Sequence, residues 1–172
     1  EIGVRLVGSE MCIRDREYLM AILIDNLIAE ELRKSAADLT KESGQGFNMP
    51  IEGRFTSPFG LSKHPIFGMV RQHNGVDFGC VRGQPIWAAK AGKVIFAGLK
   101  SGYGNVVLIE HEGPVITLYA HQQELLVSGG HRIEMGDVLC RCGSSGWSTG
   151  PHLHFEVRTG GEAKDPMIVL PR

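Results

Sequence analysis

The sequence has no excess of charge of either sign and no long uninterrupted apolar run. Its formal net charge is −1 over 172 residues. A basic surface of the kind that binds nucleic acid is therefore not indicated, and we expect no nucleic-acid partner. The apolar segment around residues 19–28 is interrupted by Asp25 and Asn26, so it is too short to span a bilayer.

The first 16 residues have none of the usual features of a protein N-terminus. They do not begin with Met, they show neither alternation nor a helical period, and they lack the apolar run of a signal peptide. The string VGSEMCIRDR within them resembles the translated read-through of a sequencing adapter. We therefore interpret residues 1–16 as a non-native leader, and we expect the natural signal or anchor to be missing from this sequence.

Residues 17–41 contain no Gly or Pro and are rich in Leu, Ile, Ala and Glu, which favours a helix. Met20, Leu23 and Leu27 begin an irregular apolar stripe at three- to four-residue spacing. We interpret this helix as the remnant of a coiled coil or as part of a lost upstream domain. The segment 42–50 contains Gly and Pro and is predicted to be a linker.

From residue 51 onward the pattern changes to short β-branched runs separated by glycine-rich turns. GNVVLIEH and VITLYAH lie on either side of EGP and predict a hairpin. DVLCRCG and HLHFEVR lie on either side of SSGWSTGP and predict a second pair. The predicted fold class is therefore mainly β: a compact antiparallel β-sheet domain over residues 51–172, preceded by an N-terminal α-helix.

Histidine occurs only in this predicted β domain. The seven positions are His64, His73, His111, His121, His131, His152 and His154.

Three of the settings in which these histidines occur suggest chemistry. HNGVD places His73 four residues before Asp77, and LYAH ends a predicted strand at His121. HLH places His152 and His154 on one face of a strand, because strand side chains alternate between faces. Taken singly, these are ordinary features of turns and exposed strands. Their combination in one short β domain points instead to a shared site.

Imidazole and carboxylate groups are the ligands of catalytic zinc, which takes three protein ligands and leaves a fourth position for water. One zinc ion would use three of the five side chains and leave two histidines for proton transfer. No HExxH motif is present, so a histidine is the available base.

Residues 53–166 resemble the lysostaphin-type, or LytM-domain, zinc metalloendopeptidases that cut peptidoglycan peptides. The matching segments, in the family's order, are GRFTSPFGLSKHPIFG, HNGVDFG, GQPIWAAKAGKVIFAG, GYGNVVLIEHEG, TLYAHQ, MGDVLCRCGSSGWSTGPHLHFEV and the final DP. The resemblance implies one zinc ion held by His73, Asp77 and His154. It implies that His121 and His152 stay off the metal, where they orient and deprotonate the attacking water or stabilise the tetrahedral intermediate.

The resemblance further implies a zinc-dependent endopeptidase that hydrolyses peptide crosslinks of bacterial peptidoglycan, with zinc-bound water as nucleophile. Peptidoglycan stem peptides would be its substrate and the cell envelope, periplasmic or extracellular, its location. Cell-envelope or divisome partners would bind through the N-terminal helix. Two alternatives stay open: a non-catalytic LytM-like module that activates a cell-wall amidase, and a wall-binding β domain with incidental histidines. Since all five family positions are filled, the sequence favours the enzyme.

Two departures from the family pattern bear on the substrate. Ser62 and Lys63 stand where an Arg is usual, and Phe67 and Met69 occupy the region in which relatives that cut glycine bridges often carry a Tyr. This favours cleavage of direct stem-peptide crosslinks between D-alanine and a diamino acid.

Three further side chains are candidates for supporting roles. Glu156 shares the face of His154 by strand parity, so it either orients a neighbouring ligand or is an exposed strand residue. Tyr103 and Trp147 lie in glycine-rich loops, where they either line a peptide groove or serve ordinary packing.

The four cysteines allow several arrangements. Cys12 falls in the leader. Because the other three, Cys80, Cys140 and Cys142, cannot all pair, we expect buried free thiols. A disulfide from Cys80 to Cys140 or Cys142 is the alternative in an oxidising compartment. A closed Cys2His2 zinc site is disfavoured, because it would remove the open position that catalysis needs.

Overall fold

The computed structural model describes residues 46–63 and 70–171. In chain order the strands are β1 (Arg54–Ser57), β2 (Gly60–Lys63), β3 (Val70–His73), β4 (Val76–Gly79), β5 (Pro85–Trp87), β6 (Gly92–Lys100), β7 (Gly104–Glu110), β8 (Val115–Gln122), β9 (Glu124–Leu125), β10 (Arg132–Ile133), β11 (Val138–Arg141), β12 (His152–Thr159) and β13 (Glu162–Lys164). One short 3₁₀ turn follows at Pro166–Ile168. The prediction of a mainly β, antiparallel domain is confirmed.

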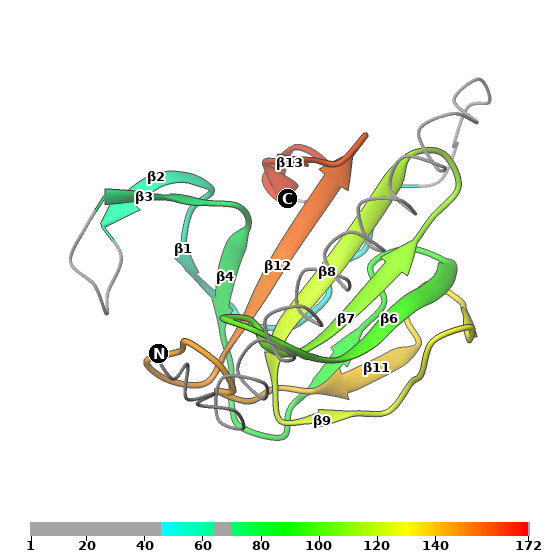
Figure 1. Ribbon diagram of the computed structural model, residues 1–172, viewed down its shortest axis with the longest axis horizontal. Coiled ribbons are helices and arrows are strands. Elements are labelled where there is room, and N and C mark those ends of the chain that lie inside the picture. The colour runs from blue at the N-terminus through cyan, green and yellow to red at the C-terminus, as the bar shows by residue number, and fades with distance from the viewer. Residues whose placement is uncertain (1–45, 64–69, 172) are drawn as a thin grey trace, which may run out of the picture.

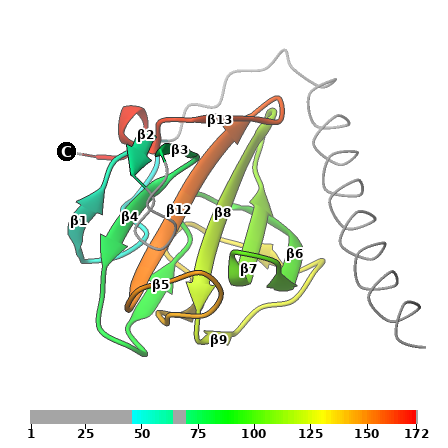
Figure 2. The ribbon, with the colours of Figure 1, turned by 60° about the vertical axis from the view of Figure 1, so that its left-hand side comes forward.

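A large antiparallel sheet with the order β1-β4-β12-β8-β7-β6-β10 organises the domain, and β13 extends it from β12. Figure 2 shows β1, β4, β12, β8, β7 and β6 side by side in this order. A small sheet, β5-β11-β9, lies beneath it, and the β2–β3 hairpin projects from the body (Figure 1). The hairpin predicted from GNVVLIEH and VITLYAH is confirmed, because β7 pairs with β8.

Apolar side chains from both sheets form the main core. Ile86 and Leu139 of the small sheet belong to the same buried cluster as Tyr119 and Phe155 of the large sheet. A second, smaller cluster with Leu108 among its members covers the opposite face of β7 and β8. The large sheet is therefore buried on both faces over its central strands, which explains why β7 and β8 read as nearly continuous apolar runs.

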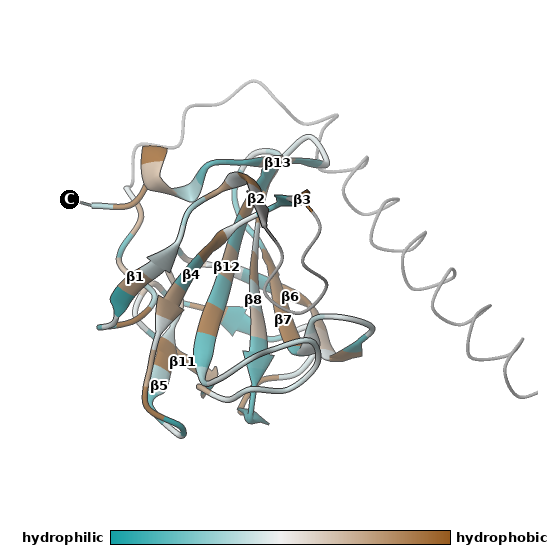
Figure 3. Ribbon diagram, turned by 90° about the vertical axis from the view of Figure 1, so that its left-hand side faces the viewer, coloured by the Kyte–Doolittle hydropathy of each residue, from teal (hydrophilic) through white to brown (hydrophobic). Residues whose placement is uncertain are grey.

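Strand β12 shows how this core positions polar groups. Its odd-numbered side chains, Leu153, Phe155 and Val157, are buried in the main core. Strand alternation therefore turns His152, His154 and Glu156 to the opposite face. Figure 3 shows the resulting bands of apolar and polar residues along the strand.

The second predicted strand pair is wrong. β11 pairs with β5 and β9, whereas β12 pairs with β4, β8 and β13. The loop 142–151 crosses from the small sheet to the large one instead of closing a hairpin, because the apolar side chains of β11 and β12 enter the core from two different layers.

The predicted helix over 17–41 lies outside the described residues. The predicted linker is described from residue 46, where Phe47 and Met49 pack against the core. The backbone N–H of Asn48 donates to the carbonyl of Ala89 at 2.8 Å. Within the described ranges, no helix has the length and apolar character needed to cross a membrane.

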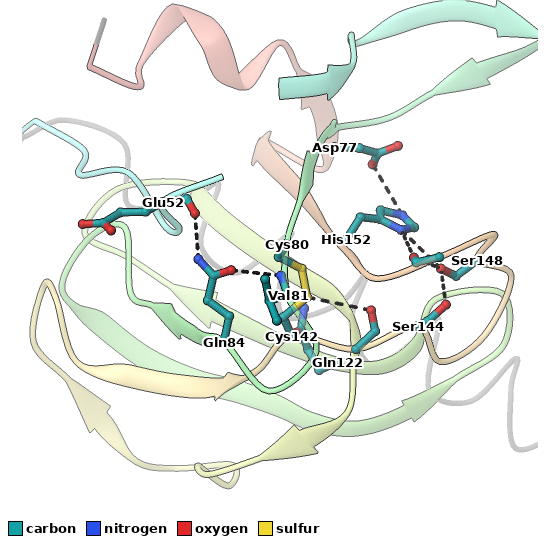
Figure 4. Close-up of a disulfide and its surroundings, with 12 residues drawn as sticks. Glu52, Asp77, Cys80, Val81, Gln84, Gln122, Cys142, Ser144, Ser148 and His152 are labelled. Carbon is teal, nitrogen blue, oxygen red and sulfur yellow. Dashed lines mark hydrogen bonds and ion pairs between the residues drawn. A yellow bond between two sulfur atoms is a disulfide. The ribbon is translucent and has the colours of Figure 1, made fainter. Parts of the chain in front are cut away.

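A disulfide joins Cys80, directly after β4, to Cys142, directly after β11 (Figure 4). The expectation of free thiols is therefore wrong for these two residues, and among the cysteines that the structure describes Cys140 stays free and buried. Their Cα atoms lie 6.5 Å apart although 62 residues separate them in sequence. Cysteine spacing could not reveal this pairing, because it depends on where the ends of two different sheets meet.

The loop after this disulfide docks on the turn before β7. Ser145 Oγ accepts the N–H of Asn105 at 2.9 Å and donates to the Gln122 carbonyl at 2.7 Å. Gly104 has a φ of 68°, and a Cβ on it would collide with the backbone of Ser145. This position therefore needs glycine for its conformation and for the close approach.

We expect loss of the disulfide to destabilise the fold substantially. Closing a loop of this length removes about 4 kcal/mol of chain entropy from the unfolded state, and changing Cys80 and Cys142 to Ala should lower the free energy of unfolding by about 2–4 kcal/mol. Denaturant titration with and without reductant measures this. Reductant should weaken the wild type and leave the double variant unchanged, and a wild type that is insensitive to reductant would contradict the expectation.

Gly104→Ala should destabilise more than Gly113→Ala. Both glycines have positive φ, 68° and 82°, but a Cβ on Gly113 would meet nothing within 4 Å. The control therefore reports backbone strain alone, about 1 kcal/mol, and Gly104→Ala should cost about 1–3 kcal/mol more by overpacking. Equal losses of unfolding free energy in the two variants, measured by thermal or denaturant unfolding, would show that the loop does not pack closely against this turn.

Candidate metal centre

The three side chains predicted as ligands converge where β3, β4 and β12 meet. His73 ends β3, Asp77 lies in β4, and His154 lies in β12 with its Cα paired to that of Asp77. His73 Nε2 is 3.2 Å from Asp77 Oδ1 and 3.0 Å from His154 Nδ1, and His154 Nδ1 is 2.8 Å from Asp77 Oδ1. Among the described residues these three form the group of His, Cys, Asp or Glu side chains with metal-binding spacing.

The other ring nitrogen of each histidine has a partner elsewhere. His73 Nδ1 lies 2.7 Å from the carbonyl oxygen of Pro58, so it carries the proton and donates. His154 Nε2 lies 3.0 Å from Glu156 Oε1 and donates to that carboxylate. His73 Nε2 and His154 Nδ1 both face Asp77, where each would offer a lone pair once a bound cation replaces the proton that His154 shares with that carboxylate.

This donor set fits zinc. Ligands about 2.1 Å from a tetrahedral ion have donor atoms roughly 3.4 Å apart. The three separations here, 2.8–3.2 Å, are slightly shorter. Two imidazoles and one carboxylate also match the nitrogen and oxygen ligands of catalytic zinc sites.

The electrostatics of the centre favour positive charge. Burial raises the pKa of Asp77, but its hydrogen bonds with His154 and His73 outweigh burial and hold the pKa well below its usual range. Burial lowers the pKa of His154, but hydrogen bonds with Asp77 and Glu156 outweigh it and raise the pKa to about 9. Two carboxylates thus create the field that a bound cation would satisfy.

The two remaining predicted histidines flank the same centre. His152 begins β12, with Nδ1 2.8 Å from the Gly150 carbonyl and Nε2 4.0 Å from Asp77 Oδ1. His121, in β8, has Nδ1 2.7 Å from the Ser145 carbonyl. The two rings lie 4.7 Å apart between centroids. In both, the carbonyl fixes the proton on Nδ1 and leaves Nε2 with a lone pair.

His121 is held in an unusual state. It is the one non-glycine residue with positive φ in the described part of the chain, at 65°. Such a conformation costs on the order of 1–3 kcal/mol and persists only where the surroundings impose it. Burial lowers the pKa of His121 to about 4, so the imidazole is neutral at neutral pH.

A groove of about 700 Å³ runs over these groups. Its walls include β1, the end of β3, the 101–103 turn and the 147–151 loop. Tyr103 and Trp147, both candidates for a peptide groove, line it. Glu156, whose role the sequence left open, is fully buried beneath it rather than exposed.

The other histidines lie elsewhere. His111 is buried between the Ala91 carbonyl and Thr117, and burial lowers its pKa to about 4. His131 is in an exposed loop against Ser128. His64 lies outside the described residues, as do the side chains of Ser62, Lys63, Phe67 and Met69, where the sequence departs from the family pattern.

Sequence reasoning missed the backbone groups that orient the histidines. The carbonyls of Pro58, Ser145 and Gly150 hold three of the four rings. A backbone carbonyl leaves no residue-type signal, and only the glycine-rich composition of SSGWSTGP indicated a tightly folded loop. Arg158, which bonds Glu156, was also missed, although its spacing of four from His154 places it on the same strand face.

Comparison with known proteins matches residues 71–166 to the model of Peptidase family M23. The DD-carboxypeptidase/endopeptidase Mpg of Neisseria meningitidis serogroup B is 42% identical over 126 residues, covering 72% of this chain and 29% of that protein. The chain thus spans less than a third of this curated relative.

Two solved structures share the fold. A zinc-containing peptidase from Vibrio cholerae has a TM-score of 0.67 at 37% identity, covering 72% of this chain and 40% of that one. The catalytic domain of lysostaphin from Staphylococcus simulans has a TM-score of 0.62 at 32% identity, covering 67% of this chain and 90% of that one. The chain therefore belongs to peptidase family M23, as its resemblance to LytM-domain sequences predicted.

Proposed function

We propose that this protein is a zinc-dependent endopeptidase that hydrolyses peptide crosslinks of bacterial peptidoglycan. One observation carries the proposal: His73 Nε2, His154 Nδ1 and Asp77 Oδ1 lie within 3.2 Å of one another, beside two further histidines. All five family positions carry the expected His or Asp, which argues against the alternative of a LytM-like module that only activates an amidase.

His73, Asp77 and His154 would hold the zinc. Zinc, when bound there, lowers the pKa of water to about 7 and polarises a carbonyl oxygen. His121 is neutral, buried and anchored through Nδ1, so its Nε2 can accept a proton at the centre. His152 is anchored in the same way, and its Nε2 can donate to an oxyanion or to a leaving amine once protonated.

The groove supports an extended peptide as substrate. Tyr103 and Trp147 offer aromatic surface, and hydroxyl groups such as those of Ser57 and Ser148 offer hydrogen bonds along its walls. The name of the Neisseria relative, DD-carboxypeptidase/endopeptidase, agrees with the crosslink class that the sequence favoured, between D-alanine and a diamino acid. We assign this bond as the target.

We place the protein in the cell envelope, where its substrate lies. The disulfide between Cys80 and Cys142 supports an oxidising compartment. Recruitment of cell-envelope or divisome partners through residues 17–41 stays a prediction, since that segment lies outside the described residues.

The test measures bound zinc and crosslink-cleaved muropeptides from purified sacculi. The wild type should bind one zinc and release cleaved muropeptides, and His154→Ala should lose both, because two ligands hold zinc far more weakly than three. A folded wild type that neither binds zinc nor cleaves sacculi would contradict the proposed enzymatic function. Zinc without cleavage, together with stimulation of an added amidase, would favour the activating module instead.

His121→Asn should separate metal binding from catalysis. Asn tolerates the positive φ at this position, so the backbone should persist. Zinc content should match the wild type while the cleavage rate falls about 100- to 10,000-fold, since a proton-transfer group is lost. Unchanged cleavage would remove His121 from the reaction.

A further inference from the structure

Glu156 is a fully buried carboxylate that accepts three hydrogen bonds. His154 Nε2 lies 3.0 Å and the Tyr103 hydroxyl 2.8 Å from Oε1, and Arg158 Nε lies 2.7 Å from Oε2. A buried carboxylate is costly unless it is paired and hydrogen-bonded. Each of its oxygens is satisfied here, and the three donors come from two different elements, β12 and the turn before β7.

The division of donors between the two oxygens matters. Arg158 supplies a positive charge at Oε2, so Oε1 is free to accept from His154 and Tyr103. Tyr103 also packs its ring 5.8 Å from that of His154, between centroids. Arg158 and Tyr103 therefore fix the position of the Glu156 carboxylate that accepts from the His154 imidazole.

We infer that Glu156, held by Arg158 and Tyr103, is the positioning residue of the metal centre. This rests on the proposed zinc site. A neutral imidazole carries its proton on either nitrogen, and only the tautomer protonated at Nε2 leaves Nδ1 free to face Asp77 and His73. By accepting at Nε2, Glu156 selects this tautomer and sets the plane of the ring.

Tyr103 also connects this hydrogen-bond network to His121. Its backbone carbonyl accepts the N–H of His121 at 2.9 Å, while its hydroxyl reaches Glu156. One residue therefore links the orientation of the ligand His154 with the backbone position of His121.

The test is zinc affinity measured by competition with a chelator. Glu156→Gln keeps the shape but loses the charge, and zinc should bind about 10- to 100-fold more weakly, the usual cost of losing a partner of a ligating histidine. Glu162→Gln is the matched control, because Glu162 is exposed on β13 and pairs with Lys164 away from the groove. Its zinc affinity should equal that of the wild type.

Two further measurements separate positioning from a merely structural role. Nitrogen-15 NMR of the histidine rings should show His154 protonated at Nε2 in the wild type, with that signal shifted or lost in Glu156→Gln. Tyr103→Phe should lower the zinc affinity by less than Glu156→Gln does. The double variant should bind zinc no more weakly than Glu156→Gln alone, because both residues act through one hydrogen-bonded unit.

The outcomes are distinct. A wild type that binds no zinc would overturn the proposed function. A wild type that binds zinc, with Glu156→Gln folded and binding it equally well, would overturn only the positioning role. Excess zinc should restore most of the cleavage by Glu156→Gln, and a loss that zinc does not restore would also contradict the inference.

Discussion

The pairing of β12 with β4 on one side and β8 on the other is the constraint on which the rest of the structure depends. It sets His154 opposite Asp77 and opposite Ala120, the residue before His121. A slip of one residue would turn both histidines of HLH into the core and bring Leu153 and Phe155 to the groove. The apolar packing of those two residues therefore holds the metal centre in register.

With the strands in this register, the protein holds each of the four imidazoles through one ring nitrogen. Backbone carbonyls hold His73, His121 and His152, and a carboxylate holds His154. The difference follows from position. His154 lies in the buried middle of the sheet, where backbone carbonyls are used in strand pairing, so a side chain must supply its acceptor.

The loop 142–151 connects stability with the site. Its start is tied to β4 by the disulfide, its middle rests on Gly104, and its carbonyls orient His121 and His152. The strain of His121 at positive φ is held in place by this docking. The positions of His121 and His152 therefore depend on a loop that is anchored at both ends by the two sheets.

Much of this protein could be predicted from local sequence. Alternation in HLHFEV placed His152, His154 and Glu156 on one face, the turn EGP marked the β7–β8 hairpin, and the ordered motifs identified the family. The partners of β11, the choice of a Cys80–Cys142 disulfide over the other cysteine arrangements, and the carbonyl anchors could not be predicted. A side chain's face follows from its own strand, so the sequence alone determined it. Which distant strands and loops meet that face depends on how two sheets pack together, so only the tertiary structure decided it.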